Sequence, residues 1–264
     1  MTRSEVSAAK RIVVKVGSSS ISGENTSMLA TLVDALAVAH ARGIEVVLVS
    51  SGAIASALPF FGLTARPQDD LVTEQAAAAV GQTILMDRYR DALRPHSIVG
   101  AQILLTSADI EDRDTRSNAR AAMEKLLELR FLPIVNENDT VATHEIRFGD
   151  NDRLAALVAA LLEADLLILL SDVDALYTKP PHLDGAEQIE FVTHGDDFAG
   201  IEIGGNGSLV GTGGAETKIH AARFATDHGV PVILTSAKNV NAALSGEDIG
   251  TWFEAAPHSE KINR

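Results

Sequence analysis

Residues Ile12-Val13-Val14-Lys15-Val16-Gly17-Ser18-Ser19-Ser20 decide the fold class of this 264-residue chain. Short runs that are hydrophobic throughout predict strands buried on both faces of a sheet. The chain has such runs at 12–16, 44–49, 98–105, 132–135, 166–170 and 230–234. Helical spacing lies between them at 27–41, 74–94, 115–129, 152–163 and 216–228. This alternation predicts an α/β fold with an open, mostly parallel sheet covered by helices on both faces.

The composition excludes several classes of protein. Hydrophobic residues make up 46% of the chain and charged residues 22%, which is typical of a folded globular protein. The formal net charge of −14 repels DNA and RNA, so no nucleic-acid partner is expected. The chain has no cysteine, which excludes disulfides and thiolate metal sites. It starts without a secretory signal, and its longest apolar run, 154–162, is too short to span a membrane, so we expect a cytoplasmic protein.

Chemistry is expected where the strands end, because ligands of an open parallel sheet bind beyond the carboxyl ends of its strands. Lys15 closes the first strand, and Gly17 and three serines follow it. Lysine suits a phosphate as a compact charge, and glycine lets backbone amides approach phosphate oxygens. A solvated lysine above a serine turn would use the same residues. Ser51 follows the second strand, either as part of an anion site at a helix N-terminus or as an ordinary N-cap.

Two polar segments follow the fourth strand. Residues 136–140 offer oxygens for an ammonium group and amides for a carboxylate, although an Asx-turn would explain some of them. Residues 149–152 then place Asp150 and Asp152 at the start of a helix. One carboxylate could face a ligand while the other orients a lysine, or both could cap the helix or bind a metal. Their spacing alone leaves these alternatives open.

A glycine-rich segment, 211–218, opens the last predicted helix with Thr212 and Lys218. Flexible backbone donors, a hydroxyl and a lysine are the parts that a nucleotide polyphosphate requires, although a solvated lysine after a plain loop is the simpler alternative. The chain lacks a Walker A sequence, a dinucleotide-binding glycine motif, a zincin motif and the HRD motif of protein kinases. The residues therefore predict phosphate binding of another kind.

Seven segments, taken in order, resemble the amino acid kinase family, and within it the branch that phosphorylates the side-chain carboxylate of free glutamate. They are 15–19, 51–55, 80–82, 135–142, 148–152, 176–178 and 211–214 with Lys218. The resemblance covers nearly the whole chain. It implies a three-layer α-β-α sandwich with an open, mainly parallel central sheet. It also implies one domain, 1–264, with an amino acid lobe over approximately 1–160 and an ATP lobe over 161–264.

The resemblance implies a role for each candidate site residue. Lys15 and Lys218 would neutralise the transferring phosphoryl group from both sides, and Asp152 would hold the two lysines in position. Glutamate would be bound by Ser51, Asp139, Asn151 and, near its α-amino group, Asp150. ATP would contact Lys15, Ser171, Asp172, Thr212, Gly213, Gly214 and Lys218, and Mg²⁺ would bridge its phosphates.

The family also implies a place in metabolism. ATP and L-glutamate would give L-glutamyl 5-phosphate and ADP, the first step of proline biosynthesis. A glutamyl phosphate reductase would be the functional partner, proline a possible feedback inhibitor, and the enzyme a homo-oligomer. The C-terminal RNA-modification-like (PUA) module of many members is expected to be missing. Two alternatives are a kinase of the same fold that acts on acetylglutamate or UMP, and a non-catalytic amino acid sensor.

Overall fold

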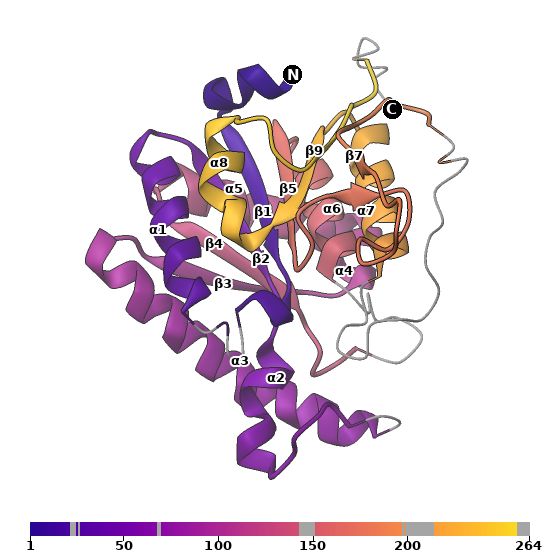
Figure 1. The fold of residues 1–264 in the computed structure, drawn as a ribbon. Helices are drawn as coiled ribbons and strands as arrows, with labels where there is room; N and C mark the ends of the chain where they lie inside the picture. Colours follow the sequence, from indigo (N-terminus) through magenta and orange to yellow (C-terminus); the bar gives the residue numbers. More distant parts are fainter. Residues whose placement is uncertain are drawn as a thin grey trace.

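The computed structural model describes residues 1–21, 25, 27–67, 70–142, 151–196, 198 and 214–257. In this part of the chain, one sheet has the strand order β3-β4-β2-β1-β5-β9-β10-β8, and β6 pairs with β7 separately (Figure 1). The strands are β1 Arg11–Val16, β2 Glu45–Ser50, β3 Gly100–Leu105, β4 Leu132–Glu137, β5 Leu166–Ser171, β6 Leu176–Tyr177, β7 Gln188–Ile189, β8 Phe191–Val192, β9 Val232–Ser236 and β10 Thr251–Phe253. Neighbours in the large sheet are parallel except for β9 and β10. The expected open, mainly parallel sheet is confirmed.

Eight α-helices surround the strands in the described part of the chain. They are α1 Met28–Ala41, α2 Ala53–Ala57, α3 Leu71–Leu93, α4 Ser107–Glu111, α5 Arg113–Glu128, α6 Asn151–Leu161, α7 Ala215–Asp227 and α8 Val240–Ser245. Short 3-10 helices are η1 Arg3–Ala8, η2 Ser18–Ser20, η4 Leu58–Phe61, η5 Arg94–His96 and η6 Ala237–Asn239. Each of the five helices expected from the sequence is present, with its ends shifted by a few residues at most.

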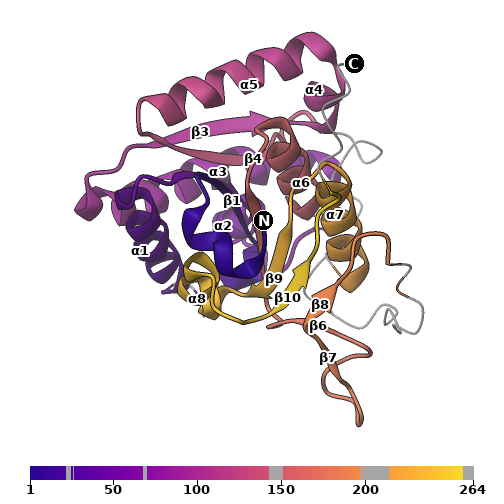
Figure 2. The same ribbon diagram turned by 90° about the horizontal axis from the view of Figure 1, so that it is seen from above.

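The helices form a layer on each face of the sheet, because successive strand residues point to opposite faces. Ile12 and Val14 of β1 belong to a buried cluster with residues of α1, α3 and α8. Val13, between them, belongs to a second cluster with residues of α5, α6 and α7. Figure 2 shows α1 and α8 on one side of the strands and α5 and α6 on the other. The three-layer α-β-α sandwich is therefore confirmed.

The same alternation sends polar side chains at the strand ends to different layers. Lys15 has the parity of Val13, so it faces the layer of α6 and α7. Ser50 and Asn136 instead have the parity of Leu48 and Ile134, which pack against the layer that contains α3. The carboxyl edge of the sheet therefore carries a cation on one face and hydrogen-bonding groups on the other.

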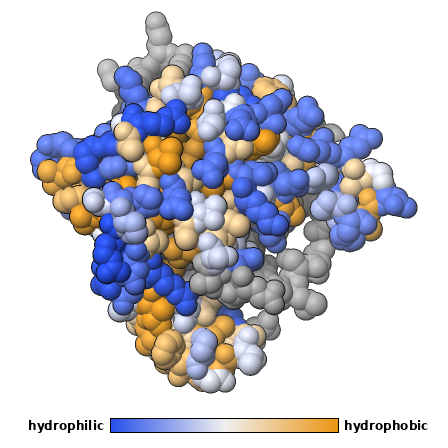
Figure 3. Space-filling view, turned by 60° about the vertical axis from the view of Figure 1, so that its left-hand side comes forward, coloured by the Kyte–Doolittle hydropathy of each residue, from blue (hydrophilic) through white to orange (hydrophobic). Residues whose placement is uncertain are grey.

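An apolar patch covers the protruding end of the molecule formed by η4 and the start of α3. Phe60 and Val72 are each 74% exposed there. Figure 3 shows hydrophobic surface at this lower end of the molecule. Residues of this kind on a water-facing surface are typical of contact sites for other proteins.

In the part of the chain that the structure describes, no helix combines the length and the apolar character that a membrane crossing requires.

Candidate active site

Lys15 lies near the carboxyl end of β1, a central strand that pairs with β2 on one side and β5 on the other. Only 2% of its surface is exposed. An ammonium group is expensive to bury unless charged or polar groups surround it. The position therefore requires a partner of opposite charge.

Asp152 supplies that charge from the first turn of α6. One carboxylate oxygen, Oδ1, lies 2.5 Å from Nζ of Lys15, and the other, Oδ2, lies 3.0 Å from Nζ of Lys218. Lys218 comes from the first turn of α7 and is 7% exposed, while Asp152 is fully buried. Three elements distant in sequence thus meet at one carboxylate. The structure thus brings together the three residues expected to be catalytic, and their catalytic role stays a prediction.

The cluster gathers positive charge in a way that suits an anionic ligand. Among the described residues, two buried ammonium groups share one buried carboxylate. A buried ion pair rarely repays the cost of its desolvation, so stability alone is a weak reason for this arrangement. Cations held at a fixed separation in a region of low dielectric bind and stabilise phosphate charge strongly.

The start of α7 adds main-chain donors to the same region. Gly214 is the N-cap of this helix with extended backbone, and the hydroxyl of Thr217 donates to its carbonyl at 2.9 Å. The first amides of a helix point along its axis and attract anions. Thr212 and Gly213, also expected to contact ATP, lie outside the described residues.

Ser171 and Asp172 mark the end of β5, which is the next strand of the sheet. Ser171 is buried and donates its hydroxyl hydrogen to Oδ1 of Asp172 at 2.9 Å, while Asp172 is exposed. The pair therefore lies at the carboxyl edge of the sheet, where β5 stands between β1 and β9. Its contact with a nucleotide stays a prediction.

The candidate residues for the amino acid lie on the other half of the same edge. Ser51 follows β2 directly and precedes α2, whose N-cap, Gly52, has a φ of +99°. A residue with a side chain would be strained in this left-handed conformation. Asp139 follows β4 and is half-buried, and Asn151 opens α6 beside Asp152. Asp150, expected near the α-amino group, lies outside the described residues.

Two residues of α3 join this region although no role was predicted for them from the sequence. Gln82 hydrogen-bonds Asn136 of β4, and Tyr89 hydrogen-bonds Ser50 of β2. Burial raises the pKa of Tyr89, and its bond with Ser50 opposes that effect only in part, so the phenol stays protonated. A glutamine among the mostly small and apolar buried residues of α3 is the available signal, and it is a weak one.

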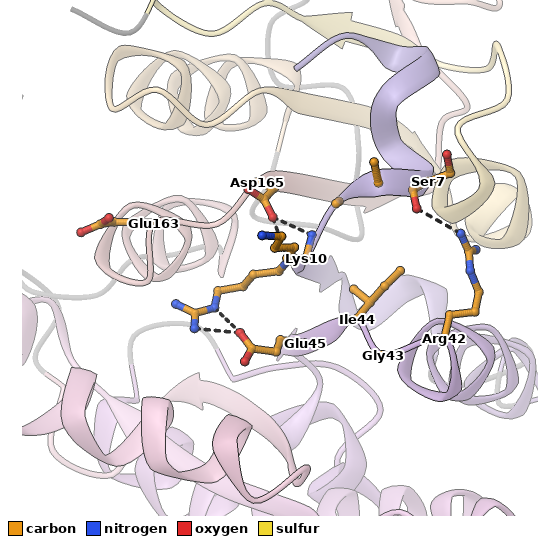
Figure 4. Close-up of a pocket in the computed structure, with 11 residues that line it drawn as sticks. Ser7, Lys10, Arg42, Gly43, Ile44, Glu45, Glu163 and Asp165 are labelled. Carbon is orange, nitrogen blue, oxygen red and sulfur yellow. Dashed lines mark hydrogen bonds and ion pairs between the residues drawn. The ribbon is translucent and has the colours of Figure 1, made fainter. Parts of the chain in front are cut away.

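The larger of the two described cavities lies at the opposite edge of the sheet. It has a volume of about 650 Å³ and is bounded by the amino ends of β1, β2 and β5 (Figure 4). In this cavity Oδ2 of Asp165 accepts from the amides of Lys10 and Arg11, and Arg11 donates to Glu45. The lysine–carboxylate cluster is the stronger candidate because it gathers two buried ammonium groups at the carboxyl edge, where ligands of open parallel sheets bind.

This fold and site define a class of protein, an α/β phosphate-binding protein that holds two buried lysines on one carboxylate at the carboxyl edge of a parallel sheet. A model described as "Amino acid kinase family" matches residues 10–236 of the chain. The chain belongs to the amino acid kinase family.

The chain is similar to several bacterial proteins named Glutamate 5-kinase. It is 64% identical over 255 residues to that of Leifsonia xyli subsp. xyli, across 96% of this chain and 94% of the relative. It is 63% identical over 252 residues to that of Clavibacter michiganensis subsp. michiganensis, across 96% and 97%. To that of Thermobifida fusca it is 52% identical over 268 residues, across 100% of this chain and 69% of the relative.

Solved structures confirm the fold. Carbamate kinase from Giardia lamblia bound to AMP-PNP has a TM-score of 0.66 at 17% identity, across 95% of this chain and 100% of that one. Isopentenyl phosphate kinase has a TM-score of 0.64 at 18% identity, across 92% and 99%. The amino acid kinase fold expected from the sequence is therefore correct.

Proposed function

We propose that this chain transfers the γ-phosphoryl group of ATP to the side-chain carboxylate of L-glutamate, giving L-glutamyl 5-phosphate and ADP. The observation that carries the proposal is the buried Lys15–Asp152–Lys218 cluster at the carboxyl edge of the sheet. The names of the similar proteins supply the substrate. The reaction would be the first step of proline biosynthesis, in the cytoplasm.

The chemistry needs alignment and charge neutralisation more than proton transfer. A glutamate carboxylate is already ionised at neutral pH, so no general base is required. One of its oxygens forms a bond to the γ-phosphorus while the bond from that phosphorus to the β-phosphate oxygen breaks. Negative charge on the transferring group is greatest during this exchange, and Lys15 and Lys218 would stabilise it. Asp152 would keep the two ammonium groups apart and directed.

The two halves of the edge would divide the substrates. Ser51, Asp139, Asn151 and Asp150 would bind glutamate on the half formed by β2 and β4. ATP would lie on the half formed by β5 and α7, against Ser171, Asp172, Thr212, Gly213 and Gly214. Mg²⁺ would be held mainly by the nucleotide itself, because this metal needs few protein ligands beside phosphates, and it would supply positive charge to the transferring group.

A hydroxamate assay tests the proposal. Purified protein with ATP and Mg²⁺ is incubated with glutamate, N-acetylglutamate, aspartate or UMP; hydroxylamine traps any acyl phosphate, and released ADP reports every transfer. We expect glutamate hydroxamate and an equal amount of ADP. Turnover of acetylglutamate or UMP in place of glutamate would establish the alternative kinase activity. Calorimetric binding of glutamate or proline without any ADP release would establish the amino acid sensor.

The proposal extends to regulation and assembly. Proline would inhibit as the end product, and a reductase would consume the labile acyl phosphate. A homo-oligomer is supported by the apolar patch that contains the exposed Phe60 and Val72. Sedimentation velocity of the purified chain, with and without proline, tests both the oligomer and its response.

A further inference from the structure

Helix α3 carries two polar side chains on its buried stripe, at the level of the candidate amino acid site. Gln82, Leu85 and Tyr89 follow one another at helical spacing on this stripe, and all three are buried. Gln82 is 8% exposed and Tyr89 is fully buried. Polar groups in such places cost free energy unless they make specific hydrogen bonds. Both residues make them, and both bonds lead toward loops assigned to the substrate.

Gln82 begins a chain of side-chain amides. Its Oε1 accepts a hydrogen bond of 2.8 Å from Nδ2 of Asn136. The Oδ1 of Asn136 accepts from the main-chain amide of Glu137 at 2.9 Å and from Nδ2 of Asn151 at 2.7 Å. A main-chain amide can only donate, so the bond to Glu137 fixes which end of Asn136 is the oxygen. That orientation then fixes the amides of Gln82 and Asn151.

This chain of amides determines which atom of Asn151 is available to a ligand. Its Nδ2 donates to Asn136 and also to the carbonyl of Ser50 at 2.5 Å. An amide nitrogen has two hydrogens, so both are used. The oxygen of Asn151 is the atom that remains, and an oxygen accepts from an ammonium group but not from a carboxylate. Asn151 therefore suits the α-ammonium group of an amino acid.

Tyr89 acts on the neighbouring loop in the same way. Its hydroxyl lies 2.7 Å from Oγ of Ser50, and that Oγ donates to the carbonyl of Ser51 at 3.2 Å. The Ser50 hydrogen is thereby used, so the Tyr89 hydroxyl is the donor in the bond between them. Tyr89 thus restrains the peptide of Ser51, which is a candidate glutamate ligand.

Gly81 allows α3 to approach α2 closely. A Cβ atom at Gly81 would lie 1.7 Å from the carbonyl oxygen of Ala53, in the first turn of α2. Only glycine allows this approach of the two backbones. Gln82, the next residue, also has a buried Nε2 without a hydrogen-bond partner among the described residues. An unpaired buried donor costs free energy, which calls for a reason beyond packing.

We propose that Gln82 and Tyr89 are positioning residues for the amino acid site: Gln82 sets the amide of Asn151 through Asn136, and Tyr89 sets the loop of Ser51 through Ser50. The inference rests on the proposed function, because it assumes that Ser51 and Asn151 bind the amino acid substrate. Neither residue needs to touch the substrate. Their effect should be on the binding of the amino acid and not on ATP.

Steady-state kinetics of three variants tests the proposal. Gln82→Met removes the amide at similar volume, Tyr89→Phe removes only the hydroxyl, and Gln82→Glu keeps an oxygen that can accept from Asn136. We expect Gln82→Met to raise the KM for glutamate by about tenfold, the effect of losing one well-placed hydrogen bond. Its kcat and its KM for ATP should change by less than about twofold, which is small beside that tenfold effect. Tyr89→Phe should act in the same direction, and Gln82→Glu should restore most of the affinity.

Leu85→Val is the matched control for packing, because Leu85 lies between the two residues on the same stripe. It should lower the thermal midpoint while leaving the KM for glutamate unchanged. Glutarate, which lacks the α-ammonium group, gives a second readout. The ratio of kcat/KM for glutamate to kcat/KM for glutarate should be smaller in Gln82→Met than in the wild type.

The outcomes separate the two proposals. Suppose that the wild type turns over glutamate. If Gln82→Met then leaves the KM for glutamate unchanged, or raises the KM for ATP by the same factor, the inference is overturned and the proposed function stands. A wild type that prefers another acidic substrate would overturn the proposed function. The same comparison made with that substrate would still decide whether Gln82 positions its binding site.

Discussion

At the scale of single residues, the two lysines carry the clearest expectation. Replacing Lys15 or Lys218 by Met keeps much of the buried volume and removes one of the charges beside Asp152. Each change should lower kcat by a factor of about 10² to 10³, roughly 3 kcal/mol, as the loss of one preorganised electrostatic donor does in other active sites. The rate of ADP release at saturating ATP and glutamate measures it.

Lys10 provides the control for this experiment. It is exposed at the amino end of β1, on the opposite edge of the sheet from Lys15. Lys10→Met should leave kcat within about twofold, since a solvated charge so far from the site is screened by water and salt. Equal kcat values for the Lys15, Lys218 and Lys10 variants would contradict the proposed role of the cluster.

Candidate site residues could be predicted from the sequence where polar and charged residues gather at the end of a strand or the start of a helix. Lys15 and Lys218 each stand in such a segment, so the sequence alone marks both as candidates. Their meeting at Asp152 was not predictable from spacing, because β1, α6 and α7 are far apart in the chain and only tertiary packing joins them. Gln82 escaped prediction of a role for the same reason: its partner, Asn136, lies on β4.

At the scale of elements, the contact between α2 and α3 carries a second prediction. Gly81→Ala would place a methyl group 1.7 Å from the carbonyl oxygen of Ala53, so α3 must move away from α2. We expect a loss of at least about 1–3 kcal/mol in the free energy of unfolding, typical of overpacking. The KM for glutamate should rise too, because the displaced helix carries Gln82. Urea unfolding and steady-state kinetics give the two values.

Val80→Ala is the companion variant, since Val80 is the preceding residue of α3 and is 41% exposed. It should change the unfolding free energy by less than about 0.5 kcal/mol, as surface substitutions usually do. If Gly81→Ala proved as stable and as active as Val80→Ala, the close approach of α2 and α3 would be unimportant.

The elements that could be predicted from the sequence are those long enough to show a hydrophobic pattern of their own. Five of the six long strands, β1, β2, β4, β5 and β9, are mostly hydrophobic and buried on both faces, as their sequences predict. The sixth, β3, is mostly half-buried with Gln102 exposed, because it lies at the edge of the sheet. Strands β8 and β10 are two and three residues long, and no periodicity can be read from so few. They are strands because Trp252 pairs with both Ile233 and Phe191. That pairing joins segments distant in sequence, so it depends on the tertiary structure and cannot be predicted from either segment alone.

At the scale of the whole molecule, the two expected lobes share one continuous sheet. β1, in the expected amino acid lobe, pairs along its length with β5, in the expected ATP lobe, from Ile12 opposite Leu166 to Val16 opposite Leu170. Asp152 on α6 then joins Lys15 of one half to Lys218 of the other. The hydrophobic clusters on both faces likewise include strands from both halves. Such a structure has no plane along which one half could unfold without exposing the other.

We therefore expect one cooperative unfolding transition in calorimetry, and we expect ligands of either half to shift it as a whole. A non-hydrolysable ATP analogue with Mg²⁺ at about 100 times its dissociation constant should add about 2.7 kcal/mol. At roughly 2–4 °C per kcal/mol, the midpoint should rise by about 5–10 °C. Glutamate should raise the same midpoint although it binds the other half. Lys218→Met should lose most of the shift caused by the analogue and keep part of the shift caused by glutamate. Two resolved transitions, each responding to only one ligand, would show that the halves are separate folding units joined at their surfaces.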